Sequence, residues 1–286
     1  MLDGAKALAL PTKFGQDLVV SPGANNEIKW KSFDQDGSIW FEDTFTFDEI
    51  RKKSPNTSNS IKSTLIEILN AAYALNLEFI DSSEGFEVET RLTFPKFWGL
   101  GTSSTLINNI AQWLQIDAYT LLWDSFGGSG YDIACAQHSS PIIYSLDDNL
   151  PKVREIKFNP PFTNNIWFVY LNRKQSSKAA ISSYYANRSE HLNEKLQSIN
   201  RITSIISETD NPGVFAREIE NHESIISDII EMETAKETFF PDFKGSIKSL
   251  GGWGGDFILA MSREDPTAYF HSKGFKTVVP YQDMIL

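Results

Sequence analysis

Strand-type and helix-type hydrophobic patterns alternate along this chain, and this alternation restricts the possible folds more than any other sequence feature. Alternating apolar residues predict strands at residues 27–33 and 38–45. Apolar residues three and four positions apart predict helices at residues 60–75 and 189–207. Because strands and helices interleave in both halves of the chain, we predict an α+β fold.

The length of the chain and one proline pair predict its division into domains. At 286 residues the chain is longer than a typical single domain, so two domains are expected. Pro160 and Pro161 stand in a polar stretch after which the sequence becomes more helical. We therefore expect an N-terminal domain over residues 1–160 and a C-terminal domain over residues 161–286.

Charge and cysteine content narrow the possible partners and the compartment. The net charge of -11 argues against a broad nucleic-acid or anionic-membrane surface, because both need a basic field. The one cysteine, Cys135, cannot form an internal disulfide, which favours a reducing compartment. No segment has the apolar length of a membrane span, and the N-terminus lacks a signal-peptide pattern. We expect a cytoplasmic protein.

A glycine–hydroxyl turn (residues 99–104) stands directly before one predicted helix. It reads Gly-Leu-Gly-Thr-Ser-Ser, and apolar residues at helical spacing follow it. The start of a helix presents unpaired N–H groups and the positive end of the helix dipole, and glycine lets an anion come close. The turn is therefore a candidate phosphate site whose hydroxyl groups could join a magnesium shell. The simpler alternative is that Thr102 or Ser103 only caps the helix.

Two further glycine loops carry acidic residues. An acidic turn (residues 127–132) ends in Asp132, which could orient an acceptor hydroxyl and take its proton, or simply face water. A third glycine loop (residues 251–256) has four glycines in five positions, and such a loop can approach a phosphate or form an ordinary turn. No lysine lies between residues 96 and 152, and Ser104 replaces a third glycine, which excludes Walker A and dinucleotide-binding motifs.

The order of these loops resembles that of the GHMP kinases, the superfamily of galactokinase, homoserine kinase, mevalonate kinase and phosphomevalonate kinase. Residues 95–104 resemble its second motif, and residues 128–134 resemble its glycine-serine-glycine-x-aspartate segment, nearest the phosphomevalonate kinase form. Residues 171–178 are similar to the opening of its second domain, and residues 251–256 to its third motif. Residues 2–9 resemble the end of its first motif, so the resemblance covers nearly the whole chain.

The resemblance implies a two-domain fold and a reaction. The N-terminal domain would resemble domain 2 of ribosomal protein S5, and the C-terminal domain would be a ferredoxin-like α+β domain, with the active site in the cleft between them. ATP and Mg²⁺ would be the cofactors, and a small acidic metabolite of mevalonate or phosphomevalonate type would accept the phosphoryl group. The implied catalytic residue is Asp132, and the implied magnesium ligand is Ser103. The implied ATP-binding residues are Gly99, Leu100, Gly101, Thr102, Ser103, Ser104, Gly252 and Gly254.

Three departures from the family pattern leave alternatives open. The family has a first strand with a catalytic lysine before the position of Leu2, so either the start of the reading frame lies upstream or a catalytic cation is lacking. The magnesium-binding glutamate of the family has no clear counterpart in this sequence. Asp124 either substitutes for it or is simply a solvated residue. Trp253 stands where the third motif has glycine, and its side chain would narrow that loop.

These departures keep two alternatives to a small-molecule kinase. One is a nucleotide-binding sensor or scaffold without catalysis, and the other is a decarboxylase of diphosphorylated mevalonate. Neither the acceptor nor the oligomeric state follows from the sequence. The basic residues that could bind an acidic acceptor, or could simply be solvated, are Lys13, Arg173, Lys174 and Lys178.

Overall fold

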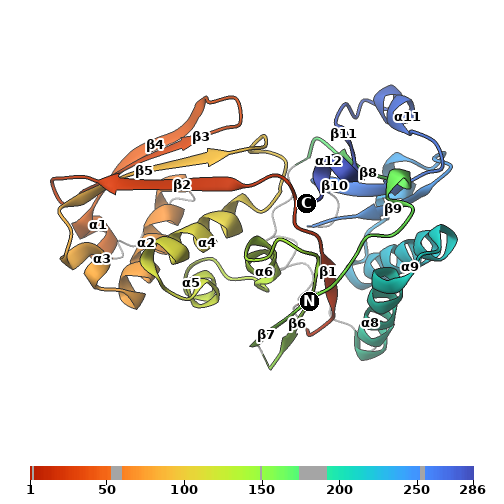
Figure 1. The fold of residues 1–286 in the computed structure, drawn as a ribbon, viewed down its shortest axis with the longest axis horizontal. Coiled ribbons are helices and arrows are strands. Elements are labelled where there is room, and N and C mark those ends of the chain that lie inside the picture. Colours follow the sequence, from red (N-terminus) through yellow and green to blue (C-terminus); the bar gives the residue numbers. More distant parts are fainter. Residues whose placement is uncertain (2, 53–59, 149, 174–191, 252–254) are drawn as a thin grey trace. The chain divides into compact units, whose positions relative to one another are not determined.

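The computed structural model describes residues 1–286 apart from residues 2, 53–59, 149, 174–191 and 252–254. The chain divides into two compact units (Figure 1). Unit 1 contains Met1–Lys13, Phe97–Gly99 and His138–Leu286, and unit 2 contains Phe14–Lys96 and Leu100–Gln137. The boundary expected at residue 160 falls inside unit 1, because strands on both sides of it belong to that unit.

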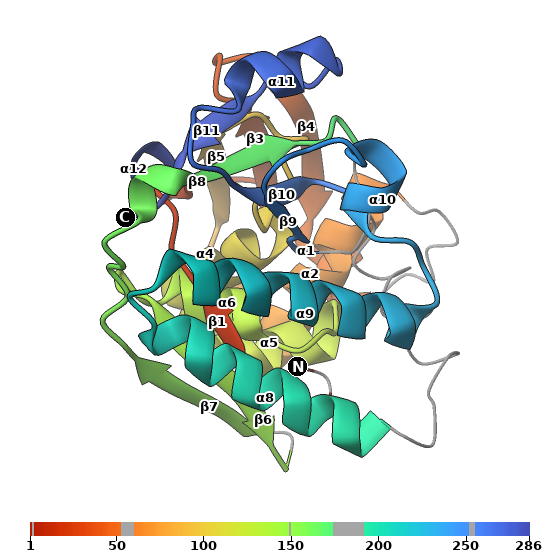
Figure 2. The same cartoon turned by 90° about the vertical axis from the view of Figure 1, so that its right-hand side faces the viewer.

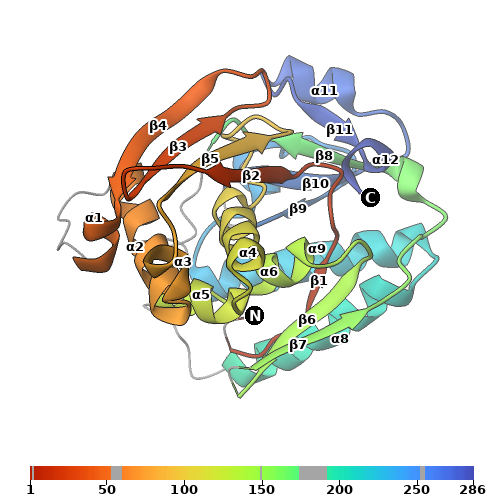
Figure 3. The same ribbon diagram turned by 60° about the vertical axis from the view of Figure 1, so that its left-hand side comes forward.

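Unit 2 is built on a four-stranded sheet of order β2-β5-β3-β4. Strands β3 and β5 are parallel, and the other pairs are antiparallel. Figures 1 and 3 show the helices of this unit along one face of the sheet. The strands are β2 (Gln16–Pro22), β3 (Glu27–Phe33), β4 (Ile39–Thr46) and β5 (Gly85–Leu92); the helices are α1 (Phe47–Lys52), α2 (Ile61–Leu75), α3 (Glu78–Asp81), α4 (Thr102–Leu114), α5 (Ala118–Ser125) and α6 (Tyr131–Ala136).

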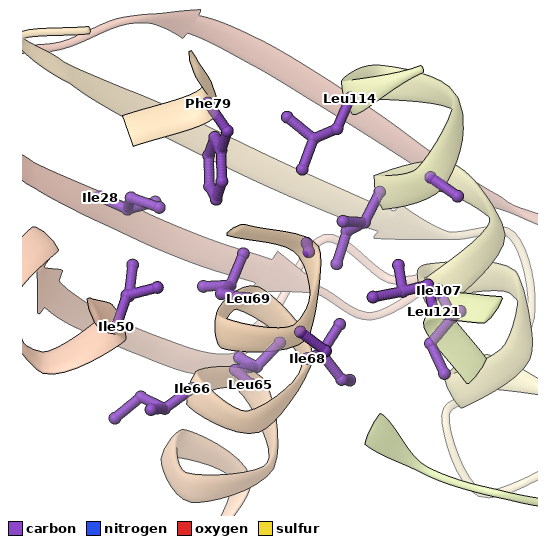
Figure 4. Close-up of a cluster of buried hydrophobic side chains, with 14 of the residues drawn as sticks. Ile28, Ile50, Leu65, Ile66, Ile68, Leu69, Phe79, Ile107, Leu114 and Leu121 are labelled. Atoms are coloured by element: carbon purple, nitrogen blue, oxygen red, sulfur yellow. The ribbon is translucent and has the colours of Figure 1, made fainter. Parts of the chain in front are cut away.

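The core of unit 2 lies between this sheet and its helices. In β3, alternate residues such as Ile28 and Trp30 are buried, which the period of two of a half-covered strand requires. Figure 4 shows Ile28 with Leu69 of α2 and Ile107 of α4, among the apolar side chains that fill the space. Burial of a side chain of this size contributes about 1.5 to 3 kcal/mol. Packing against α2 and the sheet therefore holds α4, which carries the candidate turn.

Unit 1 contains two sheets among the described residues, with orders β1-β6-β7 and β11-β8-β10-β9, and all of their strand pairs are antiparallel. The strands are β1 (Ala7–Ala9), β6 (Ile142–Asp147), β7 (Leu150–Glu155), β8 (Ile166–Tyr170), β9 (Ser246–Ser249), β10 (Phe257–Met261) and β11 (Val278–Pro280). The helices are η1 (Thr163–Asn165), α8 (Leu192–Glu208), α9 (Pro212–Ile230), α10 (Ala235–Phe239), α11 (Thr267–Ser272) and α12 (Tyr281–Met284).

Helices α8 and α9 lie side by side in unit 1 (Figure 2). Ala5, Ile199 and Ile229 form a small apolar cluster that joins the start of the chain to these two helices. All five residues of β10 are buried, as expected for the central position of this strand in its sheet. The strand that precedes the third glycine loop, β9, and the strand that follows it, β10, are neighbours.

The structure confirms most of the elements that hydrophobic spacing predicts. The strand predicted at 27–33 is β3, and the helix predicted at 60–75 is α2 with Ser60 as its N-cap. The β6–β7 hairpin and strand β9 were not predicted. The helix predicted at residues 189–207 corresponds to α8, and its first three residues lie outside the described part of the chain. None of the helices in the described part of the chain is both long enough and apolar enough to cross a membrane.

Candidate active site

The glycine–hydroxyl turn starts helix α4 without a side-chain cap. Gly101 is the N-cap residue in a left-handed conformation (φ 77°, ψ 30°), and no side chain hydrogen-bonds to the cap. The first helical hydrogen bond of α4 runs from Thr105 N to Gly101 O at 2.9 Å, so the N–H groups of the first turn have no helical partner. A Cβ atom built on Gly101 would meet nothing within 4 Å. The space beside the Gly101 Cα is therefore not filled by the described residues, which leaves room for an anion at this position.

The hydroxyl groups of the turn do not cap the helix, so the capping alternative for Thr102 and Ser103 is wrong. Both residues lie inside the first turn of α4, and Ser103 is exposed. The Thr105 hydroxyl faces the protein instead and donates to the side-chain oxygen of Gln16 at 2.8 Å. Thr102 and Ser103 thus occupy positions from which hydroxyl groups can join the backbone amides in binding a ligand.

Hydrogen bonds to strand β2 fix the position of α4 within unit 2. Asn109 donates from its side chain to the carbonyl of Gln16 at 2.7 Å, and Thr105 bonds to the Gln16 side chain. Ile107 and Ile110 on the same helix are fully buried. The start of α4 is therefore held by contacts other than those of its own turn, which leaves the turn available for a ligand.

Asp132 lies in the first turn of α6, a short helix that also begins at a left-handed glycine without a side-chain cap, Gly130 (φ 81°). Burial raises the pKa of Asp132 from 3.8 to about 6, and a hydrogen bond from Tyr131 acts in the opposite direction. The adjacent residues Ile133 and Ala134 are fully buried, which explains the poor solvation of this carboxyl group. Its pKa is thus close to neutral pH, where a carboxylate is most useful in proton transfer.

Helices α4 and α6 pack against each other in unit 2. The Gln137 side chain at the end of α6 donates to the side-chain oxygen of Asn108 in α4 at 3.2 Å. Asn108 is only 3% exposed, so this bond also satisfies a buried polar group. Sequence reasoning missed this pair. A polar residue beside Ile107 on the apolar face of α4 was the available signal.

Cys135 follows Asp132 by one helical turn and does not have the properties of a nucleophile. Burial, and secondly the charge of Asp132, raise the pKa of its thiol from 9.0 to about 12. The thiolate is the reactive form, so the thiol is inert near neutral pH.

The remaining candidates are distributed over the chain. Gly99 belongs to unit 1, where its Cα faces the carboxylate of Asp256, while Leu100 begins the second segment of unit 2. Asp124 is exposed on α5. Gly252 and Gly254 lie outside the described residues, as does Trp253. Within the described ranges, no group of three or more His, Cys, Asp or Glu residues could hold a metal ion.

The two described candidate cations make contacts inside unit 1. The Lys13 ammonium donates to the backbone carbonyl of Gln282. The Arg173 guanidinium lies 4.7 Å from the ring centre of Phe239. Lys174 and Lys178 lie outside the described residues. Neither Lys13 nor Arg173 gains support as an acceptor-binding residue from these contacts.

Comparison with known proteins identifies the fold. No family model matches the sequence, and no curated protein matches it. Among solved structures, the mevalonate kinase of Methanococcus jannaschii matches with a TM-score of 0.67 at 14% identity, covering 97% of this chain and 90% of that one. The phosphomevalonate kinase of Streptococcus pneumoniae, in complex with phosphomevalonate and AMPPNP, matches with a TM-score of 0.65 at 13% identity, covering 96% and 97%.

A third structure shows how widely this fold is used. The galactokinase of Lactococcus lactis, complexed with galactose, matches with a TM-score of 0.60 at 13% identity, covering 94% of this chain and 83% of that one. The architecture is therefore that of a class of small-molecule kinases. The chain has the fold of the GHMP kinase superfamily, to which these three enzymes belong.

Proposed function

We propose that this protein is an ATP-dependent small-molecule kinase, which transfers the γ-phosphoryl group of MgATP to a hydroxyl or phosphate group of a small acidic metabolite. The observation that carries the proposal is the start of α4. A 13-residue helix begins at an uncapped left-handed glycine, and hydroxyl residues fill its first turn. Relative to a capping side chain, such a start costs only about a few tenths of a kcal/mol, and it leaves the N–H groups of the first turn for a bound anion.

The residues of the glycine–hydroxyl turn fit the phosphate groups of a nucleotide. The N–H groups of the first turn of α4 and the hydroxyls of Thr102 and Ser103 would bind the phosphate oxygens. Ser103, which is exposed, would also be a ligand of Mg²⁺. When bound, the magnesium ion neutralises charge on the transferred phosphoryl group. Phosphoryl transfer requires mainly that the protein position the reactants and stabilise the charge on the phosphate groups. The turn at Gly101 would contribute to both.

Asp132 would act on the acceptor. With a pKa of about 6 it is mostly ionised at pH 7, so it can accept a hydrogen bond from an acceptor hydroxyl and take its proton. An ordinary surface aspartate would also be ionised, but it would be a much weaker base. The packing of α6 on α4 holds this carboxylate in the same unit as the turn.

The acceptor is proposed as a compound of mevalonate or phosphomevalonate type. The motif resemblance is nearest to the phosphomevalonate kinase form, and two of the matching structures are kinases named for these substrates. The match to a galactokinase makes sugars the natural second set of acceptors to test.

An ATP-consumption assay of the full chain with both sets of acceptors tests the proposal, beside calorimetry with MgATP. We expect binding and turnover, and we expect Asp132→Asn to lower turnover by about 100-fold or more while MgATP still binds. The exposed Asp228→Asn on α9 is the matched control and should retain turnover. Binding without turnover on any acceptor would favour the sensor alternative, and release of carbon dioxide would favour the decarboxylase.

A further inference from the structure

The three residues before Leu100 are docked on unit 1 by contacts that sequence reasoning did not predict. The Tyr170 hydroxyl donates to the backbone carbonyl of Phe97 at 2.6 Å. The Trp98 ring packs edge-on against Phe257, with 5.4 Å between ring centres, and lies 6.4 Å from the ring of Tyr170. These contacts place residues 97–99 in unit 1, although the chain on both sides of them belongs to unit 2.

Gly99 makes the closest of these contacts. It has a left-handed backbone (φ +67°), and a Cβ atom built on it would lie 2.2 Å from Cγ of Asp256 and 2.3 Å from Oδ1. A side chain at residue 99 would therefore collide with the Asp256 carboxyl group, so either that group or the backbone at residue 99 would have to move. This requirement is separate from phosphate binding, which the sequence offered as the reason for the glycine.

The backbone of Asp256 is fixed on both sides. Its N–H donates to the carbonyl of Arg173 and its carbonyl accepts from the N–H of Leu171, both at 2.7 Å. Asp256 is 8% exposed and left-handed itself (φ 51°), a conformation that aspartate tolerates better than most residues. The backbone of Asp256 therefore cannot move away from Gly99 without breaking these two hydrogen bonds.

Asp256 and Tyr170 also act on each other. Burial, and secondly the negative charge of Asp256, raise the pKa of the Tyr170 phenol. The phenol therefore stays protonated at all physiological pH values and continues to donate to the Phe97 carbonyl. A tyrosine with an unshifted pKa is protonated at these pH values as well, so the bond to Phe97 does not depend on the charge of Asp256.

We propose that Asp256 is a positioning residue for the phosphate-binding turn: it clamps Gly99 onto unit 1 and, with Tyr170 and Phe257, fixes the chain two residues before Gly101. This rests on the function proposed above and deepens it. The clamp acts through the backbone of residues 99–101, which leads into the left-handed N-cap at Gly101. The bonds of Thr105 and Asn109 to Gln16 hold the body of α4, and the clamp fixes the turn from its other end. Asp256 itself need not touch the nucleotide.

A double-mutant cycle tests the clamp on the full chain. Gly99→Ala should weaken MgATP binding by about tenfold, because the methyl group meets the Asp256 carboxyl and displaces the entry to the turn. Asp256→Gly removes that obstacle, so Gly99→Ala should cost much less in the Asp256→Gly background. Asp256→Asn keeps the bulk, so it should give no such rescue. Gly274→Ala is the control for the left-handed backbone alone, since nothing lies within 4 Å of its Cβ position (φ +93°).

Amide hydrogen exchange provides a readout that does not need the nucleotide. Asp256→Gly and Tyr170→Phe should speed exchange of the amides of residues 100–105 and leave those of α2 unchanged. Tyr170→Phe removes one hydrogen bond, so it should weaken MgATP binding by about threefold to tenfold without changing the residues at the turn. A role in stability alone would lower Tm without changing MgATP affinity or the exchange pattern.

Three results would overturn the clamp. Gly99→Ala could behave like Gly274→Ala, the two mutations at 99 and 256 could be additive, or Tyr170→Phe and Asp256→Gly could leave exchange of residues 100–105 as in the wild type. A wild-type chain that bound no MgATP would remove the proposed function, and the exchange rates would still support or overturn the clamp.

Discussion

Four helices of unit 2, α2, α4, α5 and α6, begin in two different ways. Helices α2 and α5 start at residues whose side chains cap them: Ser60 accepts from the Ser63 N–H at 3.1 Å, and Asp117 accepts from the Thr120 N–H at 2.7 Å. Helices α4 and α6 start at left-handed glycines, Gly101 and Gly130, with no side-chain cap. The same unit therefore caps some helices with a side chain and starts others at a glycine without such a cap.

The two kinds of helix start serve different purposes: the capped start stabilises the helix, and the glycine start favours ligand binding. A capping side chain satisfies the helix N–H groups in the absence of any ligand and is worth about 1 kcal/mol. A glycine start gives up only about a few tenths of a kcal/mol of this energy and places no side chain over the N–H groups. The glycine starts are also the two that carry the candidate phosphate-binding hydroxyls and Asp132. Mutations at the two kinds of helix start should therefore affect different properties.

The largest expected effect is on the function of the open start of α4. Ser103→Ala should lower the rate of ATP-dependent turnover between about tenfold and 100-fold, because it removes a hydroxyl bonded to a charged group. The melting temperature should not change, since the Ser103 side chain neither caps the helix nor is buried. Steady-state kinetics and thermal melts measure both properties. Ser103→Thr, which keeps the hydroxyl, should retain most activity, and a drop in Tm with unchanged turnover would contradict the comparison.

The second effect is on the free energy of unfolding, which burial of the Asp132 carboxylate lowers. The unfolded chain ionises this carboxyl near pH 3.8, whereas the folded protein keeps its proton until about pH 6. Between these values the folded state binds more protons, so the free energy of unfolding falls as pH rises, and the loss is constant above pH 6. Allowing for the partial exposure of the group, the cost is about 1 to 2 kcal/mol.

Asp132→Asn should remove this cost. Denaturant titrations at pH 4 and pH 8 should show the variant gaining stability relative to the wild type only at the higher pH. Other groups titrate in the same window, so the measured quantity is the difference between the two proteins. An equal effect at both pH values would mean that the carboxyl group is not destabilised by burial.

The third effect belongs to the capped start of α2. In its capping box, the Ser63 hydroxyl accepts from the Ser60 N–H at 3.0 Å, while the Ser60 hydroxyl accepts from the Ser63 N–H. Ser60→Ala should lower the free energy of unfolding by about 1 kcal/mol, a Tm decrease of a few degrees. MgATP affinity should remain that of the wild type. A change in affinity without a change in Tm would reverse the assignment of the two helix starts.

The local spacing of apolar residues was sufficient to predict the helices and strands that bury one face. The spacing of Ile28 and Trp30 predicted strand β3, and the spacing of Leu65 and Leu69 predicted helix α2. The β6–β7 hairpin was not predicted, because Pro151 lies inside its second strand, and a proline usually argues against a strand. This strand lies at the edge of its sheet, and the edge position makes the proline acceptable.

The candidate site was predictable to the extent that it is local in the sequence. The glycine–hydroxyl turn and Asp132 each lie in one short stretch, so their residues could be found without a structure. The contact of Gly99 with Asp256 joins residues that are far apart in the chain, and no periodicity indicates it. The buried partner of Asn108, Gln137, was missed for the same reason. Such pairs depend on tertiary packing, which a single sequence does not specify.

The smallest expected effect concerns Cys135, the neighbour of the open α6 start. With a pKa of about 12, its thiol should react with iodoacetamide at pH 8 at least about 100-fold more slowly than an exposed cysteine, because the thiolate fraction is small. Asp132→Asn should raise the rate only a few-fold, since burial is the larger cause of the shift and the Asp132 charge the smaller. Mass spectrometry of the labelled protein measures the rate. Labelling as fast as that of an unfolded control would mean that α6 opens readily, and a rigid placement of Asp132 would then be untenable.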